Sequence, residues 1–317
     1  MKTIEELSLK LKKENSVAII CHVRPDGDTL GSALALSHAL NNLGIKAKVF
    51  CDDTVPSRFF FLKSASLVES AINDEFSAML AIDCADITRL GSFYEKFSKH
   101  KNTYTLDHHV SNTRFAKENL IIDSASNSEN VLALIESLEA EITNEIANLL
   151  LMGIMTDTGN FKHKNVTPST LFSAAKLIEK GADINKIYYH MFSKQTKERA
   201  KLFGLTMSKI RYFLDGRFAV ASILESQLIE SGAKRDETEG FIDFVMGIEG
   251  VEVGACILEI EKNKYKISFR SKGTDVNAVA STFGGGGHIM ASGCQIQGEY
   301  EEVVDKICFA VKRHVKD

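Results

Sequence analysis

A histidine and two aspartates lie close together near the N-terminus of the chain. His22 begins the segment His-Val-Arg-Pro-Asp-Gly-Asp, in which Asp26 and Asp28 stand on either side of a glycine. These three side chains can converge only in a tight loop. Carboxylate oxygens with some imidazole are ligands that divalent cations such as Mn²⁺ accept. The segment therefore predicts a metal site, although Asp26 taken alone could simply cap the next helix.

A second group of such residues is the consecutive run Asp107, His108 and His109, which follows the apolar residues 103–106. In an extended chain, neighbouring side chains point to opposite sides. We therefore expect one histidine to bind metal and the other to face a substrate. An aspartate beside them is suited to accept a hydrogen bond from a metal-binding imidazole and so to fix its tautomer.

Two single aspartates complete the set. Asp83 follows the apolar run 77–82, with Asp86 three residues later, and Asp157 ends a helical apolar run. An isolated aspartate at such a position is commonly a turn residue or a helix cap. Asp83 and Asp157 become candidates for metal binding only in combination with the first two groups.

The elements that position these residues alternate between strands and helices. Apolar runs predict strands at 16–21, 46–50, 77–82 and 103–106, and helical patterns cover 29–43, 129–140 and 144–155. This alternation predicts an α/β domain with a mainly parallel sheet and helices on both faces. Ligands of such sheets bind beyond the carboxyl ends of the strands, where the aspartates would gather. So many carboxylates on one edge would repel one another strongly unless cations lay among them.

The second half of the sequence predicts a smaller α/β domain. We expect a catalytic domain at 1–187, a Lys-rich helical linker at 188–214 and a C-terminal domain at 215–317, with a cleft between the domains. The predicted elements of the C-terminal domain are strands at 217–223, 252–260 and 265–270 and helices at 237–246, 275–282 and 301–315.

A glycine run in this domain is a candidate anion site. Gly284 to Gly287 are followed by His288, and Arg270 precedes them. Glycines let backbone N–H groups approach a phosphate closely, and a guanidinium offers a fork for two phosphate oxygens. The alternative for the glycine run alone is a flexible loop.

In this order and spacing, these motifs resemble the DHH family of phosphoesterases with its DHH-associated C-terminal domain. Total length and domain pair most resemble the group of oligoribonucleases and 3′-phosphoadenosine 5′-phosphate (pAp) phosphatases. The segment 124–130 (Ser-Ala-Ser-Asn-Ser-Glu-Asn) and His163 depart from the family pattern, which could alter substrate preference. The resemblance implies these metal ligands, with Asp83 bridging two ions: His22, Asp26, Asp28, Asp83, His108 and Asp157. It implies catalytic roles for Asp83, Asp107 and His109. It implies substrate binding by Arg270, Ser271, Asn277, Gly285, Gly286, Gly287 and His288.

By the same resemblance, the expected protein is an enzyme. It would use two Mn²⁺ ions, with Mg²⁺ or Co²⁺ as alternatives, to cleave short RNA to 5′-mononucleotides and pAp to AMP and phosphate. Two other functions stay open: hydrolysis of linear or cyclic dinucleotides such as pApA or c-di-AMP, and nucleotide binding by a catalytically inactive regulator. The resemblance also suggests a homodimer.

Composition narrows the classes of partner. The 317 residues are 44% hydrophobic and 25% charged, with a net charge of −4. Basic residues do not outnumber acidic ones, which argues against binding to long nucleic-acid duplexes. No apolar run is long enough for a membrane span, and the N-terminal residues lack the apolar centre of a signal peptide. Six scattered cysteines suit reduced thiols, so we expect a cytoplasmic protein.

Overall fold

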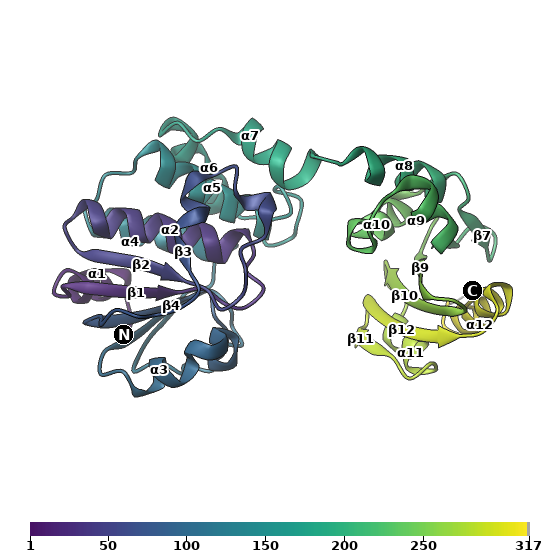
Figure 1. Ribbon diagram of the computed structural model, residues 1–317, viewed down its shortest axis with the longest axis horizontal. Coiled ribbons are helices and arrows are strands. Elements are labelled where there is room, and N and C mark those ends of the chain that lie inside the picture. The colour runs from purple at the N-terminus through teal and green to yellow at the C-terminus, as the bar shows by residue number, and fades with distance from the viewer. Residues whose placement is uncertain (316–317) are drawn as a thin grey trace. The chain divides into compact units, whose positions relative to one another are not determined.

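The computed structural model describes residues 1–315, and the chain divides into two compact units (Figure 1). The boundary lies between Lys194 and Gln195, inside the predicted linker. Helix α8 (Lys197–Met207) of that linker belongs to the second unit, because its buried Leu202 packs in the core there. This was not evident from the sequence, because charged residues dominate the first half of α8, which reads Lys-Glu-Arg-Ala-Lys.

The first unit is built on a six-stranded sheet in the order β3-β2-β1-β4-β5-β6. All five strand pairs are parallel. The central strands β1 and β4 read Ser-Val-Ala-Ile-Ile and Ala-Met-Leu-Ala-Ile, the apolar runs expected of strands that are covered on both faces. The strands are β1 (Ser16–Ile20), β2 (Lys46–Phe50), β3 (Val68–Glu69), β4 (Ala78–Ile82), β5 (Thr103–Asp107) and β6 (Glu118–Ile121).

Helices cover both faces of this sheet, as predicted (Figure 1). Val17 and Ile19 of β1 pack in the core under α1, α2, α4 and α5, whereas Ala18 and Ile20 pack in the core beneath α3. This follows from the alternation of side chains along a strand. The helices are α1 (Ile4–Leu11), α2 (Gly27–Asn42), α3 (Tyr94–Lys99), α4 (Asn127–Ser137), α5 (Asn144–Asp157), α6 (Pro168–Glu179) and α7 (Ile184–Tyr188).

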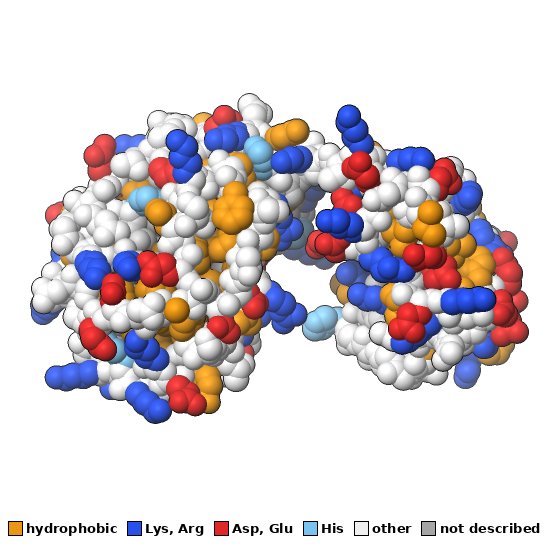
Figure 2. All heavy atoms as spheres, in the orientation of Figure 1, with side chains coloured by type: hydrophobic (Ala, Val, Ile, Leu, Met, Phe, Trp, Pro, Cys, Tyr) orange, Lys and Arg blue, Asp and Glu red, His pale blue; other side chains and the backbone are white. Residues whose placement is uncertain are grey.

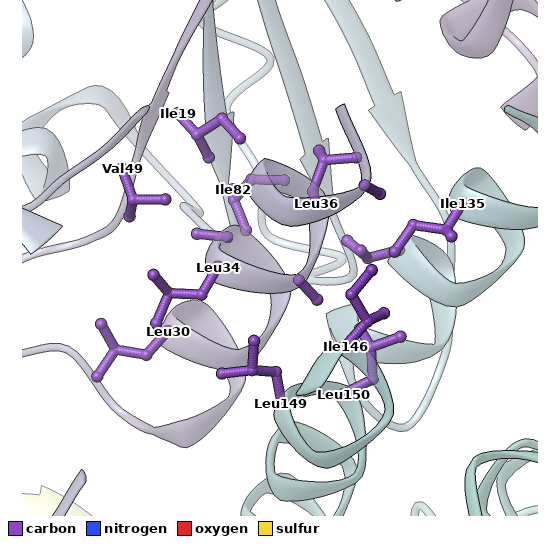
Figure 3. Packing of buried hydrophobic residues seen from close by; sticks show 14 of the residues in the cluster. Ile19, Leu30, Leu34, Leu36, Val49, Ile82, Ile135, Ile146, Leu149 and Leu150 are labelled. Atoms are coloured by element: carbon purple, nitrogen blue, oxygen red, sulfur yellow. The ribbon is translucent and has the colours of Figure 1, made fainter. Parts of the chain in front are cut away.

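Helices α2 and α5 make the most extensive helix–helix contact of this unit. Figure 3 shows leucines of α2 beside Ile146, Leu149 and Leu150 of α5. Gly31 allows the close approach, because a Cβ atom there would lie 2.4 Å from the Leu149 carbonyl oxygen. The pair matters for the site, since α2 carries two of the candidate ligands at its start and α5 carries one at its end.

The second unit is a mixed sheet in the order β11-β12-β10-β9-β8-β7, in which β8 and β9 are parallel and the other pairs antiparallel. Helices α11 and α12 pack on one face, and α8, α9 and α10 on the other. The strands are β7 (Arg211–Phe213), β8 (Phe218–Ile223), β9 (Val253–Glu261), β10 (Lys264–Ser271), β11 (Gly286–His288) and β12 (Ala291–Gln297). The remaining helices are α9 (Glu225–Ser231), α10 (Phe241–Gly247), α11 (Val276–Ser281) and α12 (Tyr300–Lys312).

The predicted helix at 237–246 was wrong in its first half. A 3₁₀ turn at Arg235–Thr238 is followed by Gly240, whose φ of +81° is left-handed, and α10 begins only at Phe241. A glycine adopts this conformation readily and so separates the two elements. Over residues 1–315, the structure contains no helix with the length and apolar character of a membrane span.

Candidate metal centre

The six candidate metal ligands converge at the carboxyl edge of the first sheet. His22, Asp83 and His108 come just after strands β1, β4 and β5, which are neighbours in the sheet. Asp26 and Asp28 lie at the start of α2, and Asp157 is the last residue of α5. The structure groups the donor atoms of these residues in two sets of three.

The first set is His22, Asp26 and Asp83, whose donor atoms lie within 4.8 Å of one another. The Nε2 atom of His22 is 3.5 Å from Oδ2 of Asp26 and 3.7 Å from Oδ2 of Asp83. The other oxygen of Asp26 caps α2 by accepting hydrogen bonds from the amides of Asp28 and Thr29. Asp26 thus fills the capping role considered above and still presents its second oxygen to the site.

The second set is Asp28, His108 and Asp157, again within 4.8 Å. The Nε2 atom of His108 is 3.4 Å from Oδ2 of Asp157 and 4.0 Å from Oδ2 of Asp28. It is also 3.4 Å from Oδ1 of Asp83.

Asp83 therefore faces both sets, one carboxylate oxygen toward each. Its backbone has a φ of +57°, a left-handed conformation that is uncommon outside glycine and tolerated best by Asn and Asp. Strain of this kind costs on the order of 1–3 kcal/mol and is retained mostly at functional sites. The conformation places the side chain at the centre of the site, where it is buried.

Backbone carbonyls fix both candidate ligand imidazoles. Nδ1 of His22 lies 2.8 Å from the Val23 carbonyl oxygen, and Nδ1 of His108 lies 3.1 Å from the Ser124 carbonyl oxygen. A carbonyl only accepts, so each Nδ1 carries the proton and donates it. The Nε2 lone pair of each ring is then left for a cation.

Asp28 is held by the N-terminus of α4. Its carboxylate accepts hydrogen bonds from the backbone N–H of Asn127 (2.6 Å) and Ser128 (2.9 Å) and from the Ser128 hydroxyl (2.5 Å). The positive end of the helix dipole favours the negative charge at this place. These partners belong to segment 124–130, which had looked only like a departure from the family pattern.

The electrostatics of the site indicate that cations belong in it. Burial, followed by the nearby carboxylates Asp28 and Asp83, raises the pKa of Asp157 to about 9. Burial and the charge of Asp83 likewise raise the pKa of Asp28 to about 7. Among the described residues, Oδ1 of Asp83 and Nε2 of His108 are buried atoms without a hydrogen-bond partner. Clustered carboxylates and unpartnered donor atoms are what bound divalent cations would satisfy.

The third group of donor atoms brings Asp107 and His109 next to this centre. The expectation that the two histidines point to opposite sides was wrong, because the strand ends at Asp107 and the rings lie edge to face, 4.5 Å apart. Asp107 was expected to orient the metal-binding imidazole, His108, but it orients His109 instead. Its Oδ1 accepts a hydrogen bond from Nδ1 of His109 (2.8 Å), and its Oδ2 accepts one from the amide of Asn112 (2.6 Å).

We predict that Asp107→Asn lowers kcat about 10- to 100-fold, the usual cost of losing an outer partner of a functional imidazole. The variant keeps the metal-facing atoms, so Mn²⁺ affinity measured by calorimetry should stay near that of the wild type. Steady-state kinetics give kcat. A variant with unchanged kcat would show that the orientation of His109 has no part in turnover.

The candidate substrate residues of the second unit surround the β11–β12 hairpin. Arg270, Ala291 and His288 stand in one row across β10, β12 and β11. The amide of Gly287 donates to Oδ1 of Asn277 (2.9 Å). Gly286–His288 form strand β11, so that part of the glycine run is ordered. Ser271 is tied to the hairpin by its backbone N–H, which donates to the Met290 carbonyl oxygen.

Two residues around the metal centre gave no signal in the sequence. The Asn165 amide donates to the carbonyl oxygens of Ala125 and Asp157, and the Asn112 amide holds Asp107 and the Cys84 carbonyl oxygen. His163, noted for its departure from the family pattern, has Nδ1 3.2 Å from the Asp157 carbonyl oxygen. An asparagine in a loop is typical of turns, so only the three-dimensional contacts reveal these roles.

Comparison with known proteins agrees with this site. The family model described as "DHH family, N-terminal domain" matches residues 16–154, and the "DHHA1 domain" matches residues 215–317. The chain is 30% identical to the "Bifunctional oligoribonuclease and PAP phosphatase NrnA" of Thermus thermophilus, over 95% of this chain and 91% of the relative. It is 26% identical to the protein of the same name from Bacillus subtilis, over 93% of each chain. Among solved structures, an "exopolyphosphatase-related protein" from Bacteroides fragilis superposes with a TM-score of 0.83 at 25% identity, covering 98% of this chain and 95% of that one.

The fold and the site are those of a hydrolytic enzyme of the phosphoesterase class. The chain belongs to the DHH family and carries the DHHA1 domain at its C-terminus.

Proposed function

We propose that this protein uses two divalent cations to hydrolyse phosphate esters of very short oligoribonucleotides, releasing 5′-mononucleotides, and of pAp, releasing AMP and phosphate. We further propose Mn²⁺ as the metal, because two imidazoles stand among the carboxylates. The observation that carries the proposal is Asp83, which presents one oxygen to each of two three-residue donor sets.

The residues fit a two-cation site. His22, Asp26 and Asp83 would hold one ion, and Asp28, His108 and Asp157 the other, with Asp83 shared. When bound, such a pair of ions lowers the pKa of water and offsets negative charge on a phosphoryl group.

The role of His109 follows from its hydrogen bond to Asp107. This bond, against the opposing effect of burial, raises the pKa of His109. A cationic ring that donates its Nδ1 proton to Asp107 keeps Nε2–H to donate to a phosphoryl oxygen as negative charge builds there. Its side chain is 43% exposed, so a substrate can reach it.

The second unit would supply substrate binding. Arg270 and His288 lie in one row of the sheet, and the Gly285 to Gly287 backbone is held beside Asn277. A guanidinium and backbone N–H groups suit phosphate oxygens. We propose these groups as the ones that grip the substrate.

Short substrates agree with the charge distribution. The net charge is −4, and on the face shown in Figure 2 each unit mixes acidic with basic side chains. Long nucleic acid is generally bound by a broad basic surface. The family resemblance also leads us to propose a homodimer, and the scattered cysteines lead us to propose that it acts in the cytoplasm.

The test is a panel of substrates offered to the purified full-length protein with Mn²⁺. The panel holds 5′-labelled RNAs of different lengths, pAp, and linear and cyclic di-adenylate, with a chelator control. We expect the highest initial rates on the shortest RNAs, together with phosphate release from pAp. A preference for a di-adenylate would contradict the proposed substrates while keeping the chemistry, and no metal-dependent hydrolysis would contradict both.

A further inference from the structure

Strand β10 of the second unit has one polar face, of which only Arg270, near the end of the strand, has a proposed role in substrate binding. Tyr265, Ile267 and Phe269 point into the core beneath α11 and α12. The intervening residues Lys266 and Ser268, with Arg270, point to the opposite face, as the alternation of side chains requires. Lysine, serine and arginine therefore form a continuous polar stripe that runs along β12, away from the turn of the β11–β12 hairpin.

This stripe is the floor of a cavity of about 320 Å³. Small residues flank Ser268 and Arg270 on the neighbouring strands and leave space above the sheet. These residues are Gly254 and Cys256 of β9 and Gly293 of β12. One wall is the 3₁₀ turn Arg235–Thr238 with the residues that lead into α10. The volume is at the lower end of the usual range for ligand pockets, so the cavity can take part of a nucleotide chain.

The two cations on this floor are unpaired. Within residues 1–315, neither Lys266 nor Arg270 takes part in an ion pair, whereas the neighbouring Lys264 pairs with Glu261 and Arg235 pairs with Glu225. In the described part of the chain, the guanidinium of Arg270 donates only to the Phe269 carbonyl oxygen. Unpaired cations on the floor of a cavity provide a site for anionic groups of a ligand.

The carboxylates of this cavity indicate what else the ligand carries. Asp236 and Glu239 line the cavity and are exposed. Carboxylate oxygens accept hydrogen bonds from ribose hydroxyls, as in many nucleotide sites. A chain of alternating phosphate and ribose therefore fits the cavity better than a plain polyanion does.

The spacing of the two cations exceeds one nucleotide. Four residues of a strand span about 13 Å, at roughly 3.3 Å per residue. Neighbouring phosphates of one strand are closer together than this, because a single ribose joins them. Lys266 and Arg270 therefore meet different phosphates of one chain.

We propose that Lys266 and Ser268 form a second phosphate subsite, which binds an oligoribonucleotide at a linkage beyond the phosphate gripped by Arg270. This inference rests on the proposed function, since it names the part of the RNA substrate that the subsite takes. The two phosphates of pAp are separated by one ribose, which is less than the four-residue spacing of Lys266 and Arg270, so the subsite serves longer substrates.

The test is a binding measurement on full-length protein in chelator, where no turnover occurs. Fluorescence anisotropy with a labelled five-nucleotide RNA gives Kd at several salt concentrations, and competition gives the Kd of pAp. We expect Lys266→Ala to raise the Kd for the RNA about three- to tenfold, the effect of one exposed phosphate contact. The slope of log K against log salt should become less steep by about 0.7, the value per phosphate charge on a single strand. The Kd of pAp should not change.

The matched control is Lys306→Ala, which removes the same charge from α12 on the other face of the sheet. An RNA affinity and salt slope that are the same in both variants would overturn the subsite. So would an equal loss of pAp binding in Lys266→Ala, because the contact would then lie within one nucleotide. Failure of the wild type to hydrolyse the panel would count against the proposed function alone, since the binding comparison involves no turnover.

Discussion

Replacing Asp83 by alanine is expected to lower kcat/KM at least about a thousandfold on every substrate, more than the 10²–10³ that one lost charge-stabilising donor typically costs. The reason is geometric. One Asp83 oxygen lies 3.7 Å from Nε2 of His22 and the other lies 3.4 Å from Nε2 of His108, so the first donor set loses a member and the second loses the carboxylate oxygen that faces it. Steady-state kinetics with Mn²⁺ give the loss in rate, and calorimetry gives the loss in Mn²⁺ stoichiometry.

The matched control is Asp86→Ala, three residues further along the same loop. Asp86 accepts a hydrogen bond from the Thr88 amide and has no atom in the three groups of donor atoms. This variant should keep activity within a few-fold of the wild type. Asp83→Ala with activity within tenfold of the wild type would show that the bridging assignment is wrong.

Removing the cations is expected to abolish hydrolysis and to lower the Tm of the first unit. An ion that binds only the folded state stabilises it by about 2.7 kcal/mol at a hundredfold excess over its Kd. For a unit of this size, 1 kcal/mol corresponds to about 2–4 °C in Tm, so one site accounts for about 5–10 °C. The buried carboxylates add to the effect, because without cations they repel one another.

Differential scanning calorimetry with chelator and with added Mn²⁺ measures this difference. Repeating the scans with Asp83→Asn provides the comparison, since that variant should gain much less from Mn²⁺ while its buried charge is gone. An equal gain in the wild type and in the variant would place the stabilising ions elsewhere on the protein. Activity should return when Mn²⁺ replaces the chelator.

The strands of the first sheet and the residues at their ends could be predicted from sequence. β1 and β4 are short apolar runs, each with a polar residue immediately or shortly after its end, and in a parallel sheet such residues meet at one edge. Edge strands gave weaker signals. β6 reads Glu-Asn-Leu-Ile with one buried residue, so it lacks the apolar run that revealed β1 and β4.

The supports of the site could not be predicted, because they join residues far apart in the chain. Nothing near Asp28 in sequence indicates that Asn127 and Ser128 bind its carboxylate. The histidine that Asp107 binds is close to it in sequence, yet it could not be predicted either. Whether it holds His108 or His109 depends on where β5 ends, and a shift of one residue exchanges the two sides of a strand.

The spread of the candidate ligands along the chain has a consequence for biosynthesis. The first donor set is complete once Asp83 has been made, but the second set includes Asp157 and is complete only after most of the first unit has emerged from the ribosome. Contacts between residues this distant in sequence form late, because closing long loops costs chain entropy. A partly synthesised chain that ends before Asp157 would therefore lack the second donor set, and the complete centre would arise only when the first unit is nearly finished.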